Sequence, residues 1–124
     1  MTNTTDLIDR YIAMWNETDG ERRRALIARI WTDGGSYVDP LMQGDGPAGI
    51  DAMVAGVQAR FPGHRFRRTG PVDAHNGHVR FAWHLAPEAG PALAARVDFG
   101  VIAPDGRLAS ITGFLDQVPA GVGA

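Results

Sequence analysis

In the first half of the chain, apolar residues recur at the spacing of three amphipathic helices. The first helix is predicted from about Thr5 to about Asn16, with the Thr4-Thr5-Asp6 segment as its cap and Tyr11 on its apolar side. The second runs from about Glu21 to Ile30. The third starts near Pro47 and ends before Pro62-Gly63, and its apolar stripe consists of Ile50, Met53, Val54, Val57 and Phe61.

The second half of the chain alternates apolar and polar residues over short stretches, which is typical of strands. Asn76-Gly77 is a strong signal for a hairpin turn, and we expect Gln43 to Gly46 to form a loop. The order of elements predicts an α+β fold: three N-terminal helices packed in a strongly curved antiparallel sheet that surrounds the first and third helices. The predicted strands are Trp31–Asp39, His64–Thr69, Val72–Ala74, His78–Leu85, Leu93–Ile102 and Leu108–Asp116.

Composition narrows the class of protein. The 124 residues fit a single domain, residues 1–118, followed by a flexible tail of small residues, 119–124. Cysteine is absent, so disulfides and thiolate metal sites are excluded, and the absence of lysine excludes Schiff-base chemistry on that side chain. The net charge of −2 and the scattered arginines argue against a nucleic-acid partner. Neither a signal peptide nor a membrane-spanning run is evident, so we expect a soluble cytoplasmic protein without a membrane partner.

The segment Ser36-Tyr37-Val38-Asp39-Pro40 has two interpretations. In the first, Tyr37 and Val38 favour a strand, which Pro40 would end. Asp39 would then be held rigidly at the end of the strand, where a loop begins and where functional residues often lie. Alternatively the Asp-Pro pair forms a simple turn, in which the aspartate side chain binds its own backbone.

The facing of Asp98 also allows two interpretations. If Val97, Phe99 and Val101 face the core, Asp98 forms a solvent-side ion pair with Arg96 that stabilises little. A four-residue loop from Glu88 to Pro91 would instead pair Phe81 with Asp98 and turn Asp98 inward. The sequence does not decide the length of this loop.

The chain resembles the ketosteroid isomerase-like (SnoaL-like, nuclear transport factor 2-like) superfamily over nearly its whole length. Arg10-Tyr11-Ile12-Ala13 is similar to the segment with the isomerase's oxyanion-hole tyrosine, and Val38-Asp39-Pro40 to the segment with its general base. Val97-Asp98, followed by an apolar strand and the Gly106-Arg107 turn, is similar to the segment with its protonated aspartic acid. The resemblance implies a cone-shaped fold around a deep apolar pocket.

The resemblance implies a small-molecule enzyme that carries out acid/base chemistry next to a carbonyl, as an isomerase or polyketide cyclase does, without a cofactor. The catalytic residues would be Asp39 as the base, and Tyr11 and Asp98 as hydrogen-bond donors to the oxygen that becomes negative. A carboxylic acid can donate in this way if an apolar site keeps it protonated. The small hydrophobic substrate would contact Trp15, Met53, Val57, Phe61, Phe81, Trp83, Ile111, Gly113 and Leu115.

Other functions stay open at this stage. A protein of this fold could bind a small hydrophobic ligand without turnover, or serve as an interaction domain with a filled pocket. In epoxide hydrolase-like members, an Arg-x-Asp such as Arg96-Val97-Asp98 works with an acid on the last strand, where this chain has only Asp116 at the end. His75 and His78 flank a turn without a third ligand, so no metal site is expected. If Asp98 faces inward, the apolar residues beside it would form a homodimer interface on the outer sheet face.

Overall fold

The computed structural model describes residues 3–117; the predicted tail, 119–124, lies outside the described residues. Three helices form as predicted: α1 (Thr4–Asn16), α2 (Gly20–Ile30) and α3 (Gly46–Arg60). The cap of α1 differs from the prediction, because Asn3 accepts the hydrogen bond from the Asp6 amide at 2.8 Å. No helix within residues 3–117 has the length and apolar character needed to cross a membrane.

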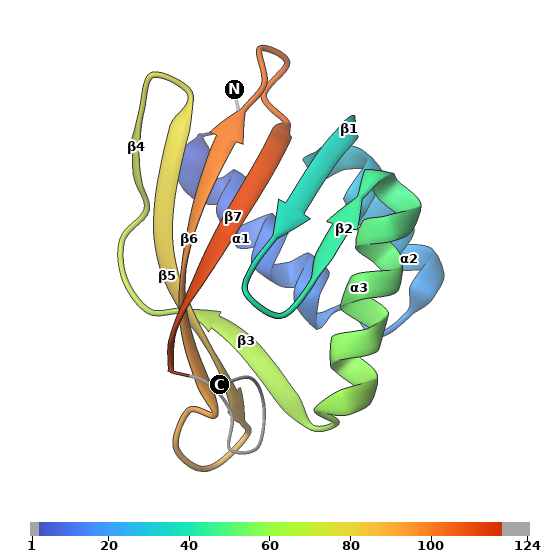
Figure 1. Ribbon diagram of the computed structural model, residues 1–124, viewed down its shortest axis with the longest axis vertical. Coiled ribbons are helices and arrows are strands. Elements are labelled where there is room, and N and C mark those ends of the chain that lie inside the picture. Colours follow the sequence, from blue (N-terminus) through green and yellow to red (C-terminus); the bar gives the residue numbers. More distant parts are fainter. Residues whose placement is uncertain (1–2, 118–124) are drawn as a thin grey trace.

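The strands belong to one strongly curled sheet, and the helices pack against its concave side (Figure 1). The strands follow one another in the order β2-β1-β7-β6-β5-β3, and β4 pairs with β5. The α+β cone expected from the sequence is therefore present. The strands are β1 (Trp31–Val38), β2 (Gln43–Asp45), β3 (His64–Arg68), β4 (Asp73–His75), β5 (His78–Pro87), β6 (Ala94–Ile102) and β7 (Leu108–Gln117).

Two features of the sheet correct the sequence analysis. Gln43–Asp45, expected to be a loop, forms β2 and pairs with the end of β1. The sheet is also mixed rather than wholly antiparallel, because β1 runs parallel to β7, with Tyr37 opposite Ile111. This pairing joins the first strand to the last one, and so it brings the residue after β1, Asp39, next to Gly113 on β7.

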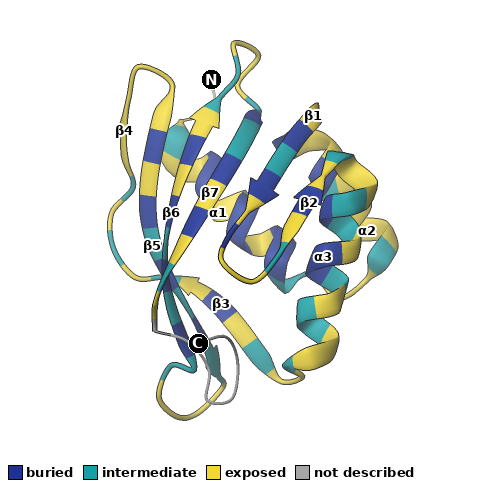
Figure 2. Cartoon of the chain, in the orientation of Figure 1, coloured by how far each residue is buried: buried dark blue, intermediate teal, exposed yellow. Residues whose placement is uncertain are grey.

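The sheet has a buried and an exposed face, so buried and exposed residues alternate along β5, β6 and β7 (Figure 2). Strand β5 pairs Phe81 with Asp98 on β6, as the four-residue loop predicted. Asp98 therefore faces the core and is fully buried, while Phe99 is exposed. The alternative solvent-side ion pair between Arg96 and Asp98 is wrong, since both side chains are buried on the inner face.

Candidate functional site

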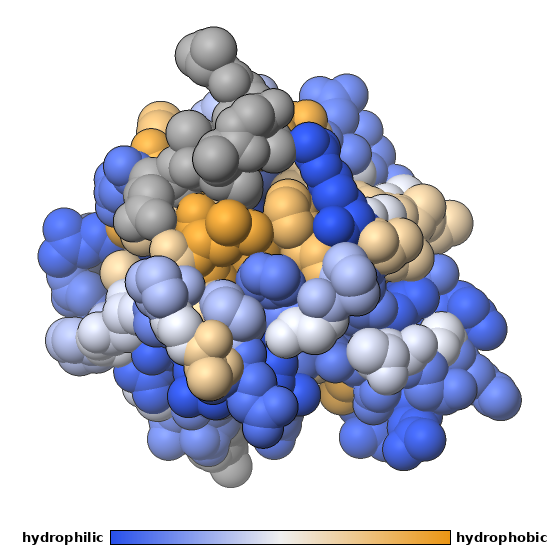
Figure 3. Space-filling view, turned by 90° about the horizontal axis from the view of Figure 1, so that it is seen from below, coloured by the Kyte–Doolittle hydropathy of each residue, from blue (hydrophilic) through white to orange (hydrophobic). Residues whose placement is uncertain are grey.

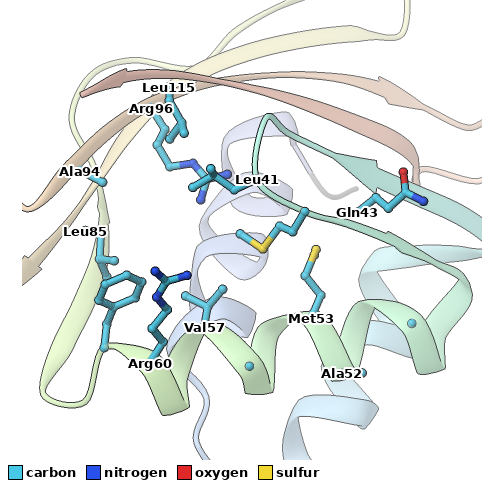
Figure 4. A pocket seen from close by; sticks show the side chains of 14 residues that line it. Leu41, Gln43, Ala52, Met53, Val57, Arg60, Leu85, Ala94, Arg96 and Leu115 are labelled. Carbon is cyan, nitrogen blue, oxygen red and sulfur yellow. The ribbon is translucent and has the colours of Figure 1, made fainter. Parts of the chain in front are cut away.

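A pocket of about 450 Å³ lies between α3 and the inner face of the sheet (Figure 4). Its wall is mainly apolar, and the loop that follows β1 forms one side of it with Leu41 and Met42. Seen from the end of the molecule where α3 passes into β3, apolar surface gathers near the centre of the face, and hydrophilic side chains lie below it in the view (Figure 3). The helix, the residue that caps its end and the strands contribute Met53, Val57, Phe61, Leu85, Ala94 and Leu115.

Arg96 connects this pocket with a cluster of polar side chains behind its wall. The residue lines the pocket, yet it is only 5% exposed. Its guanidinium lies over the ring of Trp83, 4.6 Å from the ring centroid, and its Nη2 donates to the Tyr37 hydroxyl and to Asp39. A buried arginine needs such partners, because an isolated charge in a low-dielectric site is costly.

Asp39 is held by four hydrogen bonds. Its Oδ2 accepts from Arg96 and, at 2.6 Å, from the Tyr37 hydroxyl. Its Oδ1 accepts from the backbone amides of Leu41 at 2.8 Å and Met42 at 3.0 Å. Both interpretations of the Asp-Pro pair therefore hold: the carboxylate closes a turn, and it stands at the end of β1 inside the molecule. Its side chain has no exposed surface.

Asp98 and Tyr11 form a second buried pair next to the first. The Tyr11 hydroxyl donates to Oδ2 of Asp98 at 3.0 Å, and both residues are fully buried. Burial raises the pKa of Asp98 to about 6, against the opposing effects of the Arg96 charge and of the neighbouring Trp83 and Tyr11 side chains. Burial, together with the nearby Asp98 charge, also raises the pKa of Tyr11 well above its usual value, so its hydroxyl stays neutral.

Gly113 on β7 makes room for both carboxyl groups. It lies opposite Asp98 in the sheet, and a β-carbon there would come within 2.7 Å of Asp98 Oδ1 and 3.2 Å of the Asp39 β-carbon. The only acid of β7, Asp116, is exposed near the end of the strand. The second carboxylate beside Arg96 comes from the end of β1 instead.

The residues expected to form one site lie in two layers. The outer layer is the pocket wall, which includes Met53, Val57, Phe61 and Leu115. The inner layer does not reach this pocket, because Arg96 stacked on Trp83 lies in between. Trp15 lines a smaller cavity near His64. The inner layer contains Tyr11, Trp15, Asp39, Phe81, Trp83, Asp98, Ile111 and Gly113.

Four polar residues of the site were not among the predicted ones: Tyr37, Gln43, Arg60 and Arg96. The spacing of Tyr37 and Asp39 was a usable signal, because residues two apart in an extended chain share a face. Arg96 likewise lies two residues before Asp98 and shares its facing. The histidines do not join the site, and within residues 3–117 no three His, Asp or Glu side chains gather as a metal site.

Comparison with solved structures gives the class of protein. A candidate isomerase of the SnoaL-like family from Agrobacterium tumefaciens is 41% identical and superposes with a TM-score of 0.88, covering 94% of this chain and 100% of that one. The chain belongs to the SnoaL-like family. A scan of protein-family models and a search of curated proteins found no match.

More distant structures share the fold alone. A candidate SnoaL-like polyketide cyclase from Jannaschia sp. is 16% identical, with a TM-score of 0.68 over 94% of this chain and 91% of that one. A protein with a ketosteroid isomerase-like fold from Catenulispora acidiphila, in complex with trimethylamine, is 14% identical, with a TM-score of 0.71 over 90% and 85% of the two chains.

Proposed function

We propose that this protein is an enzyme that moves a proton next to a carbonyl group of a small hydrophobic substrate, as an isomerase or a polyketide cyclase does. The main support is the position of Arg96, which lines an apolar pocket and also binds the carboxylate of Asp39. The inner end of a space that fits a small molecule is therefore formed by a cation, and a base binds that cation directly behind the pocket wall. The family of the chain, with a candidate isomerase among its members, agrees with this chemistry.

In this proposal, the substrate carbonyl oxygen accepts a hydrogen bond from Arg96 and Asp39 removes the proton from the adjacent carbon. The C–H bond breaks, its electron pair forms the enolate, and the proton moves to the carboxylate. Nη2 of Arg96 already binds Tyr37 and Asp39, whereas Nη1 makes no hydrogen bond within residues 3–117 and is free for the substrate. A donor fixed in advance in a water-poor site stabilises the enolate charge strongly.

Asp39 must become accessible for this step. Its Oδ1 is covered by the amides of Leu41 and Met42, whose side chains form part of the pocket wall. A substrate that enters the pocket pushes against these two residues and releases the carboxylate from their amides. The hydrogen bond from Tyr37 remains and keeps the carboxylate directed toward the pocket.

Tyr11 and Asp98 take a supporting role in this proposal. With a pKa raised to about 6 by burial, Asp98 carries a proton more readily than an ordinary aspartate does. Below about pH 6, where Asp98 is mainly protonated, it does not compete with Asp39 and the substrate for the charge of Arg96. Tyr11 fixes its orientation through the hydrogen bond to Oδ2. These two residues are positioning residues that act through Arg96.

The test is the exchange of the hydrogens next to the carbonyl of 2-tetralone for deuterium in D₂O, followed by proton NMR. The wild type should accelerate the exchange, and Asp39→Asn should lose about 100-fold or more of that acceleration, the usual contribution of a positioned base. Asp33→Asn is the matched control, because Asp33 lies on the same strand but is exposed. Exchange by Asp39→Asn at the wild-type rate would show that the proposal is wrong.

A second candidate function is that of a carrier for a small hydrophobic molecule. It is favoured by the complete set of hydrogen bonds around Asp39, which leaves the carboxylate without exposed surface. Binding of 2-tetralone would then quench tryptophan fluorescence, since Arg96 at the pocket lies on Trp83, but the exchange rate would equal that of buffer alone. Binding without exchange therefore identifies the carrier.

A further inference from the structure

The pocket is lined by two cations and, within residues 3–117, by no acid. These cations are Arg60 on α3 and Arg96 on β6. The charge of Arg96 is balanced by Asp39 behind the wall. Arg60 has no such counterion, because it makes no ion pair or hydrogen bond within the described chain and only lies over the ring of Phe61, 5.6 Å from its centroid. The pocket therefore presents an uncompensated positive charge to a ligand.

The direction of the Arg60 side chain makes it part of the pocket. Arg60 and Arg96 extend into the space from opposite sides, one from the helix and one from the sheet (Figure 4). A cation in the last turn of a helix is favourable by itself, since it lies near the negative end of the helix dipole. That effect accounts for a basic residue at this position but does not require its side chain to turn toward a cavity.

Gly56 leaves free space beside Arg60. It lies four residues earlier in α3, so both residues are on the same face of the helix, and both line the pocket. A β-carbon at Gly56 would have no atom within 4 Å. No side chain at Gly56 therefore fills the helix face beside Arg60, so the two oxygens of a carboxylate could approach the guanidinium in the plane of its donors.

We propose that the ligand of this pocket is an amphipathic oxo acid: a carboxylate bound at Arg60, an apolar body along α3, and a carbonyl oxygen at Arg96. The carbonyl part rests on the proposed function, whereas the carboxylate part depends on Arg60 alone. The two arginines thereby fix both ends of the molecule. The carboxylate stays at the partly hydrated mouth, and the reacting carbonyl reaches the dry inner end beside Asp39.

The experiment compares three probes by isothermal titration calorimetry: 4-oxo-4-phenylbutanoate, its methyl ester and 4-phenylbutanoate. The wild type should bind the oxo acid about tenfold or more tightly than the ester, because only the acid makes a charge-assisted hydrogen bond. Arg60→Gln should bring this ratio close to one. Arg65→Gln, an exposed arginine on the neighbouring β3, is the matched control and should keep the ratio.

Each result supports or overturns one part of the proposal. Equal affinity for acid and ester in the wild type, or an unchanged ratio in Arg60→Gln, would overturn the carboxylate site. Equal affinity for 4-oxo-4-phenylbutanoate and 4-phenylbutanoate would overturn the carbonyl contact at Arg96. Added salt should weaken binding of the acid and leave the ester unaffected, because the ion pair is exposed. If the protein fails to catalyse proton exchange, the ratio of the affinities for the acid and its methyl ester is unaffected. The proposed proton transfer and the proposed carboxylate site can therefore fail separately.

Discussion

Asp98 carries a carboxyl group in a site without exposed surface. It accepts one hydrogen bond, from Tyr11, while Oδ1 has no partner within residues 3–117. Burial raises its pKa from 3.8 to about 6, and the charge of Arg96 opposes this increase. The folded protein therefore keeps a proton on Asp98 in a pH range where the unfolded chain has already lost it.

We predict that Asp98→Asn flattens the pH dependence of stability. Because the folded-state pKa is raised, the contribution of Asp98 is fully present below about pH 4 and is lost as the pH rises through about 6. The asparagine has no proton to lose. Relative to the wild type, the variant should therefore gain roughly 1–3 kcal/mol in the free energy of unfolding between about pH 4 and pH 8.

Urea denaturation over this pH range measures the effect, with the exposed Asp33→Asn as control. Parallel stability curves for wild type and Asp98→Asn would mean that Asp98 titrates normally in the folded protein.

Which side of the sheet a residue faces could be predicted only where a local feature, such as the length of a hairpin loop, sets the strand register. The loop length between β5 and β6 determines the register, and with it the inward facing of Asp98 and of Arg96. The contact of Arg96 with Asp39 follows from no local pattern. It requires the parallel pairing of β1 with β7, which joins segments more than 70 residues apart, as the pair Tyr37 and Ile111 shows.

At the scale of elements, β2 and α3 approach each other at a glycine. Gly44 is the central residue of β2, and a β-carbon there would lie 3.0 Å from the carbonyl oxygen of Gly49 and 3.3 Å from the α-carbon of Ile50. These neighbours are backbone atoms of α3, so no side-chain rotation relieves the contact. Strand and helix together form the part of the fold that carries one side of the pocket.

We predict opposite effects of two glycine-to-alanine substitutions in this region. Gly44→Ala should lower the free energy of unfolding by about 1–3 kcal/mol, because strand and helix must move apart. Gly56→Ala, in the interior of α3 with free space around it, should raise it by about 0.5–1 kcal/mol through helix propensity. Thermal unfolding followed by circular dichroism tests both. A Gly44→Ala variant as stable as the wild type would show that β2 can move away from α3 without lowering the free energy of unfolding.

The predicted helices and longer strands match the structure because their apolar periodicity extends over many residues. β2 could not be predicted in this way, since Gln43-Gly44-Asp45 contains no apolar side chain and glycine disfavours strands. Its strand conformation comes from pairing with β1 and from the close approach to α3. The position of the pocket depends on these contacts of β2 with β1 and α3. Local sequence patterns do not show such contacts. The sequence therefore indicated an apolar site, but not which of its residues line the wall.

At the scale of the whole molecule, the outer face of the sheet exposes large apolar side chains to solvent. Phe99 is 43% exposed, Phe114 51% and Val101 39%. The rings of Phe99 and Phe114 contact each other edge to face, with their centroids 5.7 Å apart. Val38 extends this face onto β1, because it lies opposite Thr112, which in turn lies opposite Phe99. Exposed apolar residues that are contiguous across several strands are typical of an interface.

We predict that the protein is a homodimer through this face. Light scattering at micromolar concentration should give twice the mass of the chain, and Phe114→Glu should shift it to the monomer, since each copy then buries a charge without a partner. Ala59→Glu places the same charge on an exposed position of α3, outside the pocket wall, and should leave the dimer intact.

The pocket lies on the inner side of the sheet, so the monomeric variant should still bind 4-oxo-4-phenylbutanoate. A monomeric wild type would exclude this use of the outer face, and loss of binding in Phe114→Glu would show that the two faces of the sheet are coupled.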